Sequence, residues 1–437
     1  MKIGTKFGDG TDLPKNFYLN NQIKQLFDKI ENRNSHFFLA GKAGTGKSTF
    51  IEYLRINSKK KLQILSFTGV AALKGKGRTI HSFFELPHRI PNKKKDFKKS
   101  RNNVWINELD LIVLDEVSMV RADLIDAIDH CLKINRTNDM PFGGVQMLFA
   151  GDVFQMSPIV NAQEKPVLLE YYPNGPYFFN SKSYLKINPI FIELKKVYRQ
   201  KDKKFIEALE DVRRNRIDQK LLNYFNQRVI NSLNEISPGL IILAPTNYRT
   251  HQINNSKLCE LNTPRFTFSA TITGNFNLSD MPTERNLNLK VGSQVMMIKN
   301  DRNGRWVNGS LGIVDELSKD KVFVKIGNKL HQVEVDLWEK WDYRVVAGKY
   351  EPKVIGTFTQ FPIKLAWAAT IHKCQGQTFE KAVIDFDSGA FSHGMVYVAL
   401  SRVKSLSGLF LVRALKKQDI VFDKDINKFI LQNELLL

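Results

Sequence analysis

Residues 41–48 read Gly-Lys-Ala-Gly-Thr-Gly-Lys-Ser, and this run constrains the fold more than any other part of the chain. An apolar run at 36–40 comes before it, and a stretch with helical character follows from 48 to 57. Glycines let backbone N–H groups close around phosphate oxygens, and a helix N-terminus adds partial positive charge. A plain glycine-rich turn would not need the final Lys-Ser. The sequence therefore predicts a strand, a phosphate-binding loop and a helix.

Each residue type in this loop has a chemical task. We expect Lys47 to reach the β and γ phosphates of ATP and Ser48 to hold Mg²⁺. The residues predicted to bind the nucleotide are Gly41, Ala43, Gly44, Thr45, Gly46, Lys47, Ser48 and Thr49.

Short apolar runs alternate with helical patterns through the first half of the chain. Examples are 62–67, 111–114 and 145–150, and a second such series begins near Phe191. This alternation is typical of α/β folds with doubly wound parallel sheets. Between about 265 and 355 the pattern changes to short β-like runs, which we interpret as a small inserted β-barrel. The expected domains are 1–190, then 191–265 with 356–418, the insertion at 266–355, and a C-terminal helical segment at 419–437.

The chain of 437 residues carries 65 Lys and Arg against 44 Asp and Glu, a formal charge of +21. A surplus of this size is typical of proteins that bind nucleic acid. A lysine-rich proteome would give the same surplus without such a partner. The segment 91–101 holds six basic residues and one acidic residue, and is either a solvated loop or an arm that contacts DNA.

The three cysteines are widely spaced and form no Cys-x-x-Cys pair, which argues against disulfides and zinc. The sequence shows neither an N-terminal apolar export signal nor a long uncharged apolar run. We expect a protein of the cytoplasm of a bacterial-type or phage-infected cell, associated with the nucleoid and not with membranes.

Polar residues follow two further apolar strands. Asp115 and Glu116 come after 111–114, where Asp115 is expected to bind Mg²⁺ and Glu116 to polarise the attacking water. The alternative is an acid pair that caps the next helix. Gln155, in Gly-Asp-Val-Phe-Gln after 145–150, is the candidate γ-phosphate sensor, although Gly-Asp is also common in turns.

Two arginines are candidates for stabilising charge on the transferring phosphoryl group. Arg199 lies in Val-Tyr-Arg-Gln and Arg402 in Ala-Leu-Ser-Arg. If both came from a second lobe, ATP would close a cleft between the lobes. Either arginine could instead be an ordinary surface residue.

The order of motifs extends over most of the chain. In sequence they read GKAGTGKS at 41–48, FTGVAALKGKGRTIHSFF at 67–84, DEVSM at 115–119, PFGGVQMLFAGDVFQMSPIV at 141–160, KKVYRQ at 195–200, APTN at 244–247, KLAWAATIHKCQGQT at 364–378 and YVALSRVKSLSGL at 397–409. This series resembles the Pif-one-type (petite integration frequency) DNA helicases, in the RecD-like branch of helicase superfamily one. The short chain is similar to minimal bacterial or phage members. One departure is Met156-Ser157, where the family usually has Leu-Pro.

The resemblance implies two RecA-like motor domains, a wedge insertion at about 85–105, and ATP hydrolysis between the motor domains. It also implies 5′→3′ movement on single-stranded DNA and unwinding of 5′-tailed duplexes, forks, RNA–DNA hybrids and G-quadruplexes. We expect a monomer, with a dimer on DNA as the alternative. Further residues implied in binding the nucleotide are Gln22, Gln375, Gly376 and Arg402. Those implied in binding DNA are Thr68, Gly69, His81, Phe84, Asn247, His372 and Lys373.

Two other functions compete with this interpretation. An ATP-gated remodelling factor would bind nucleic acid without moving along it. A small-molecule phosphotransferase would use the phosphate loop but would have no use for a second α/β lobe. Aromatic side chains for base stacking are expected in a motor of this kind, with Phe84 and Trp367 as candidates, and either could be a core residue instead.

Overall fold

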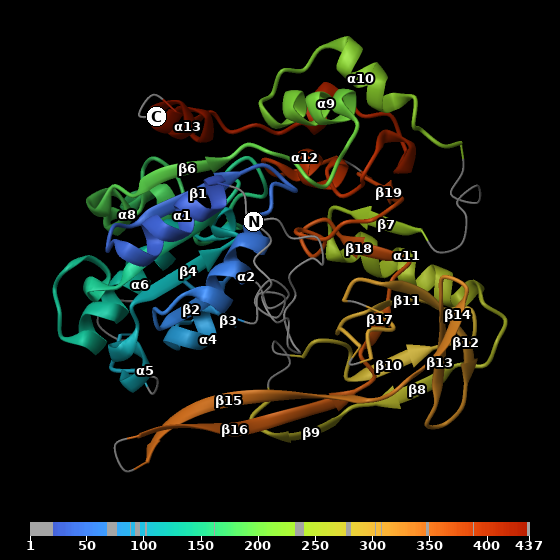
Figure 1. The fold of residues 1–437 in the computed structure, drawn as a ribbon. Helices are drawn as coiled ribbons and strands as arrows, with labels where there is room; N and C mark the ends of the chain where they lie inside the picture. The colour runs from blue at the N-terminus through green and yellow to red at the C-terminus, as the bar shows by residue number, and fades with distance from the viewer. Residues whose placement is uncertain are drawn as a thin grey trace. The chain divides into compact units, whose positions relative to one another are not determined.

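The computed structural model describes residues 21–67, 77–87, 89–91, 97–100, 103–160, 162–231, 240–276, 281–301, 303–306, 308–346, 349–387 and 389–434. The chain divides into two compact units, Met1–Arg199 with Asp423–Leu437 and Gln200–Phe422. Each unit contains one parallel sheet (Figure 1). The predicted α/β class is therefore confirmed.

The first unit is built on a six-stranded sheet whose pairings are all parallel, in the order β3-β2-β4-β5-β1-β6. Its strands are β1 (Phe37–Gly41), β2 (Leu62–Ser66), β3 (Arg78–Thr79), β4 (Leu111–Asp115), β5 (Gln146–Gly151) and β6 (Ile190–Leu194). The central strands β1, β4 and β5 are buried along their whole length, as expected where helices cover both faces of a parallel sheet.

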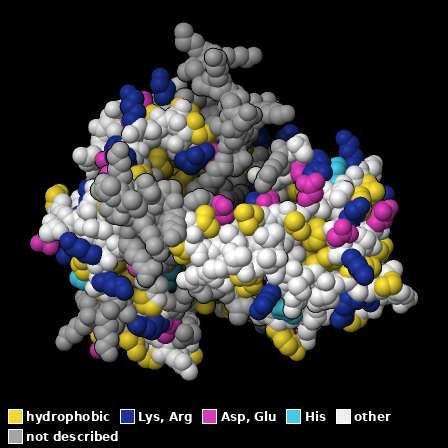
Figure 2. Space-filling view, turned by 90° about the horizontal axis from the view of Figure 1, so that it is seen from below, with side chains coloured by type: hydrophobic (Ala, Val, Ile, Leu, Met, Phe, Trp, Pro, Cys, Tyr) yellow, Lys and Arg dark blue, Asp and Glu magenta, His cyan; other side chains and the backbone are white. Residues whose placement is uncertain are grey.

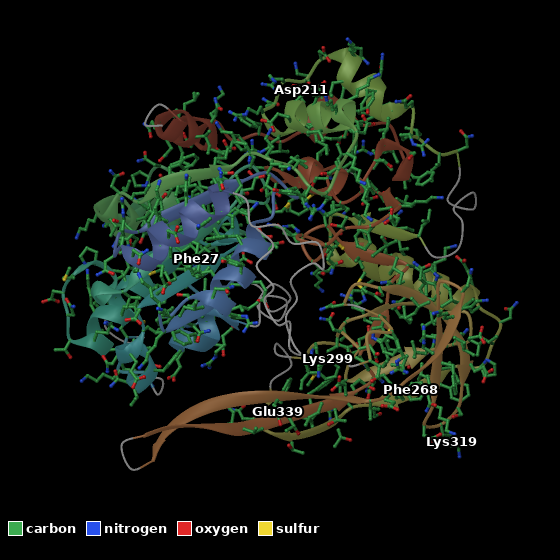
Figure 3. All side chains as sticks on the ribbon, viewed as in Figure 1. Phe27, Asp211, Phe268, Lys299, Lys319 and Glu339 are labelled. Carbon is green, nitrogen blue, oxygen red and sulfur yellow. The ribbon has the colours of Figure 1, made fainter. Side chains whose placement is uncertain are left out.

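The helices of this unit are α1 (Asn21–Asn32), α2 (Lys47–Asn57), α4 (Ile80–Phe84), α5 (Asn103–Glu108), α6 (Ala122–Arg136), α7 (Lys165–Tyr171), α8 (Lys182–Ile187) and α13 (Lys424–Glu434). Figure 1 shows α1 and α2 lying along the sheet, and apolar side chains of both helices share one core with alternate residues of the strands. Phe27 on α1, labelled in Figure 3, packs at the margin of this core.

The C-terminal helix α13 belongs to the first unit, although the chain has passed through the second unit before it. Its Phe429 stacks on Phe179, with ring centroids 4.1 Å apart and planes within 9°. Phe38 of β1 and Tyr184 of α8 lie around the same ring. The helix predicted in 419–437 is therefore present, and aromatic packing holds it against the first unit.

The expected domain boundary after residue 190 falls one strand too early. The apolar run at Phe191 is not the first strand of the second unit but lies in β6, which pairs with β1 from Phe37↔Ile190 to Gly41↔Leu194. The first unit therefore continues to Arg199.

The second unit contains a four-stranded parallel sheet in the order β18-β7-β19-β20. Its strands are β7 (Ile241–Ala244), β18 (Ala368–Thr370), β19 (Ala382–Ile384) and β20 (Leu409–Leu411), and its helices are α9 (Lys203–Arg213), α10 (Gln219–Asn226), α11 (Asn247–Glu260) and α12 (Met395–Leu400).

Antiparallel strands occupy the middle of the second unit, as the hairpin signals predicted. They are β8 (Phe266–Ser269), β9 (Thr271–Gly274), β10 (Asn286–Leu289), β11 (Gln294–Met297), β12 (Leu311–Leu317), β13 (Val322–Ile326), β14 (Lys329–Val333), β15 (Asp336–Val346), β16 (Lys349–Gln360) and β17 (Ile363–Leu365). Phe268, labelled in Figure 3, belongs to their apolar core with Trp306 and Phe361. Closure of these strands into a barrel stays a prediction.

The predicted wedge at about 85–105 lies partly outside the described residues. Among those described, Ser100 N–H donates to Asn135 Oδ1 at 2.8 Å, and Trp105 of α5 donates to Gln63 Oε1 at 3.1 Å. Both contacts join this segment to the first unit. Within the part of the chain that the structure describes, no helix is both long and apolar enough to span a membrane.

We expect Phe429→Ala to destabilise the first unit by about 3 kcal/mol, because it removes a ring that is only 9% exposed. Thermal unfolding and hydrogen exchange in α13 would measure the change. Leu431→Ala, on the same helix at a side chain 48% exposed, is the matched control. Equal unfolding temperatures for the two variants would contradict the packing role.

Candidate functional site

The phosphate loop joins β1 to α2 through two glycines in the left-handed region, Gly44 at φ 81° and Gly46 at φ 91°. A Cβ added to Gly44 would lie 2.5 Å from Cβ of Arg199, and one added to Gly41 would lie 2.6 Å from Oγ1 of Thr45. Such close approach leaves room for no side chain at either position. The tight turn predicted from the sequence is present.

Lys47 begins α2 and folds back over the loop. Its Nζ donates to the carbonyl of Gly41 at 2.6 Å and to that of Lys42 at 3.2 Å. The Lys47 side chain is 9% exposed, so this ammonium lies within the loop rather than in solvent. Ser48, the predicted Mg²⁺ ligand, is exposed in the first turn of α2.

Asp115 is the last residue of β4 and is 8% exposed. Its Oδ1 accepts the N–H of Glu116 at 2.9 Å, and Glu116 has a left-handed φ of 52° that turns the chain directly after the strand. Left-handed non-glycine residues cluster at functional sites because strain has to be maintained there. Glu116 occupies the N-cap position of a short 3-10 helix, Val117–Met119, but its side chain forms no capping bond. The pair is therefore not explained as a helix cap.

Mg²⁺ prefers oxygen ligands and usually keeps water and substrate phosphates in its coordination shell. The Ser48 hydroxyl and the Asp115 carboxylate are ligands of this type. Among the described residues no group of three or more His, Cys, Asp or Glu could enclose a metal. Two protein oxygens fit an ion held jointly with a nucleotide, as P-loop proteins hold it.

The loop after β5 is organised by Asp152, which is 1% exposed. Its carboxylate accepts Phe154 N–H at 3.2 Å and approaches Nε2 of Gln155 at 3.5 Å. Gln155, the predicted phosphate sensor, is itself 3% exposed. Sequence reasoning did not single out Asp152, although an acid directly after a buried strand was a signal for it. The unusual Met156 is fully buried.

Arg199 lies beside the phosphate loop in the first unit, not in a second lobe as expected. Strand β6 runs parallel to β1 and carries the following residues past the loop, where Tyr198 N–H donates to the Gly44 carbonyl at 2.8 Å. The Tyr198 ring also lies 4.0 Å from where a Cβ of Gly46 would be. Tyr198 is thus a loop neighbour that sequence reasoning missed, although it stands within the KKVYRQ motif.

Gln22, the residue implied in adenine recognition, lies in the first turn of α1. Its Nε2 donates to the carbonyl of Glu193 in β6 at 2.9 Å, and the residue is exposed. The contact keeps Gln22 at the strand that leads to Arg199.

Arg402 belongs to the second unit and is 1% exposed. Its guanidinium donates to the carbonyls of Val398, Cys374 and Gln377 at 2.8, 3.4 and 3.2 Å, and to Ser401 Oγ at 2.8 Å. The residues implied in nucleotide binding, Gln375 and Gly376, lie between two of these carbonyls in the chain. Arg402 therefore holds this turn in place. Burial also raises the pKa of the Cys374 thiol to about 11, so the thiol is neutral at physiological pH.

The predicted DNA-binding residues of the second unit lie at one sheet edge. Asn247 opens α11 directly after β7, and His372 and Lys373 follow β18, which pairs with β7. Asn247 and Lys373 are exposed, while His372 is half-buried and burial lowers its pKa. The imidazole is therefore mostly neutral at pH 7.

The predicted DNA-binding residues of the first unit that the structure describes are less accessible. Thr68 and Gly69 lie outside the described residues. His81 is half-buried in α4, with its ring 5.9 Å from that of Phe67, whereas Phe84 is 4% exposed and is a core residue. On the face drawn in Figure 2, the coloured Lys and Arg side chains are spread out, with acidic and apolar side chains between them.

A phosphate loop at the carboxyl edge of a parallel sheet, an acid pair on the next strand but one and a second parallel-sheet unit define a P-loop nucleoside triphosphatase. A family model described as PIF1-like helicase matches residues 18–223. The chain is 29% identical over 410 residues to the ATP-dependent DNA helicase Pif1 of Campylobacter jejuni, covering 86% of this chain and 89% of that protein.

Two solved structures are similar to this chain. Bacteroides sp Pif1 in complex with ADP-AlF4 matches with a TM-score of 0.85 and 30% identity, over 96% of this chain and 97% of that one. Bacteroides Pif1 bound to ssDNA matches with a TM-score of 0.74 and 32% identity, over 95% and 97%. The chain therefore belongs to the PIF1-like helicase family, as predicted. Its two parallel-sheet units are RecA-like motor domains.

We expect Gly44→Ala to weaken ATP binding at least about tenfold, because alanine is strained at this φ and its Cβ would clash with Arg199. Titration with a fluorescent ATP analogue would measure the affinity. Gly327→Ala is the matched control, since Gly327 has φ 59° and open space around it. Equal affinities for the two variants would show that the clash does not reach the nucleotide.

Proposed function

We propose that this chain is an ATP-driven DNA helicase that moves 5′→3′ on single-stranded DNA and thereby unwinds duplexes. The observation that carries the proposal is the Gly44–Gly46 loop with Lys47 inside it, at the same sheet edge as Asp115 and Gln155. Membership of a helicase family indicates that hydrolysis at this site drives DNA unwinding.

Each site residue of the first unit has a separate proposed role in ATP hydrolysis. Lys47 binds the β and γ phosphates, and Ser48 with Asp115 holds Mg²⁺, which neutralises charge on the phosphates when bound. Glu116 polarises the attacking water. Gln155, held by Asp152, reports whether the γ-phosphate is present.

Arg199 and Arg402 are proposed to stabilise the charge that develops on the transferring phosphoryl group. Arg199 is supported by its place against Gly44. Arg402 is supported by its bonds on both sides of Gln375 and Gly376. We propose that Gln22 contacts the adenine of ATP.

The DNA partner is proposed from chemistry and from relatives. A Pif1 protein of Bacteroides was solved with ssDNA, and two coordinating Pif1 helicases were described at forked dsDNA. We propose that this chain binds single-stranded DNA through Asn247, His372 and Lys373. Its substrates would be 5′-tailed duplexes, forks, RNA–DNA hybrids and G-quadruplexes, unwound by a monomer or by two copies on one fork.

We expect the protein to displace the strand of a duplex with a 5′ single-stranded tail and to leave the 3′-tailed duplex paired. A gel or fluorescence strand-displacement assay with ATP would measure both. Lys47→Ala, which removes the ammonium that binds phosphate, should abolish displacement and DNA-stimulated hydrolysis. Equal displacement from a 3′ tail would overturn the polarity, and DNA-stimulated hydrolysis without displacement would favour a remodelling factor.

We expect Arg402→Ala to lower kcat of DNA-stimulated hydrolysis by about 10³-fold or more, as for other arginines that stabilise phosphoryl transfer. Loss of its buried bonds should also lower the unfolding temperature. Arg413→Ala is the control for that loss, since it breaks a 2.7 Å ion pair with buried Asp419 of the same unit. A kcat for Arg402→Ala close to that of Arg413→Ala would reduce Arg402 to a structural role.

A further inference from the structure

We propose that Phe391 and Tyr248 stack on bases of single-stranded DNA at the carboxyl edge of the second unit's parallel sheet, with His372 supporting the ring of Phe391. The inference rests on the proposed function. It assigns the aromatic contacts that a DNA motor without sequence preference needs, at residues that sequence reasoning did not identify.

The two rings are unusually accessible. Tyr248 is 72% exposed and Phe391 is 59% exposed. Single exposed apolar side chains are common and carry little meaning alone. These two rings are singled out because both lie at the carboxyl edge of the parallel sheet.

The segments after three neighbouring strands place His372, Tyr248 and Phe391 at the carboxyl edge of the sheet. In the order β18-β7-β19, His372 follows β18, Tyr248 lies in the first turn of α11 after β7, and Phe391 lies in the loop after β19. The His372 and Phe391 rings are 6.4 Å apart between centroids, with planes 27° apart. Loops from the two outer strands therefore meet across the end of β7, where α11 begins.

The charges around these rings are nearly balanced, so the rings rather than charge carry the assignment. Lys373, next to His372, is exposed. The Asp385 carboxylate at the end of β19 is 2% exposed and forms a 2.9 Å ion pair with Arg249, which neutralises it. Asp387, farther along the loop, is exposed, and its backbone carbonyl accepts a bond from Arg413 at 3.0 Å.

In this inference His372 contributes to DNA binding by packing beside the ring of Phe391 rather than by pairing with a phosphate. Because burial lowers its pKa, the imidazole is a flat neutral ring at pH 7. A neutral ring tilted 27° from that of Phe391 and packed beside it would limit the motion of that side chain. Less conformational entropy is then lost when a base stacks on it.

The candidates from the sequence cannot take this part. Phe84 is 4% exposed, and Trp367 packs against the apolar core of the parallel sheet. Trp367 is half-buried, so both candidates are less accessible than Phe391 and Tyr248.

The test is the affinity for fluorescein-labelled oligothymidine, measured by anisotropy without nucleotide, against an oligonucleotide of equal length with abasic sites. Phe391→Ala and Tyr248→Ala should each bind oligothymidine about 5- to 100-fold more weakly than the wild type. On the abasic strand the same variants should match the wild type. Phe391→Trp should restore binding, because it keeps an aromatic face.

Two controls separate stacking from other effects. Leu185→Ala removes an apolar side chain that is 65% exposed in the first unit and should change nothing. The salt dependence of binding should be unaltered in Phe391→Ala, whereas Lys373→Ala should reduce its slope by about one phosphate contact.

The outcomes distinguish this inference from the proposed function. If the wild type binds oligothymidine and Phe391→Ala and Tyr248→Ala bind it equally well, the stacking assignment is wrong and the helicase proposal stands. An equal loss on abasic and normal strands would also overturn the assignment. A wild type that binds no single-stranded DNA would overturn the proposed function itself.

Discussion

Pairing of β1 with β5 on one side and β6 on the other determines the nucleotide site. The register places Ala40 opposite both Gly151 and Glu193, so three strands end at nearly the same level. Their carboxyl ends therefore deliver the phosphate loop, the Asp152 turn and the segment containing Arg199 to one edge of the sheet. Glycine is required at position 44 because Arg199 leaves no space for a Cβ there, whereas at position 46 the left-handed φ requires it.

We propose that the second unit uses the same arrangement for another ligand. Its strand β7 is paired by β18 and β19, and the loops after all three carry exposed polar or aromatic residues. The first unit presents backbone N–H groups and acids at this edge, which suit phosphates and a metal. The second presents Lys373 and the rings of Tyr248 and Phe391, which suit a flexible strand of nucleotides. In this proposal, one architecture serves two chemistries through its loops.

Sequence reasoning was most successful where chemistry is local. The turn of the phosphate loop and the place of Asp115 at a strand end could be predicted because backbone strain and charge impose residue types at fixed spacing. The unit to which Arg199 belongs could not be predicted. It depends on β6 pairing with β1, a contact across more than a hundred residues. Burial was similarly hidden: Phe84 and Phe391 are the same residue type, but only packing decides that one is in the core and the other exposed. The unit a residue belongs to and its burial depend on tertiary contacts, and sequence periodicity does not reveal these.

The buried cations Lys47 and Arg402 both donate hydrogen bonds to backbone carbonyls. Each donates to backbone carbonyls of its own unit, Lys47 to Gly41 and Lys42, and Arg402 to Cys374 and Gln377. A buried cation without acceptors would be costly, so these carbonyls stabilise it. Bonds from a cation to a phosphate oxygen are stronger than bonds to a neutral carbonyl. If phosphate oxygens reach these cations, as we propose, they can replace the carbonyls as acceptors without leaving either cation unpaired.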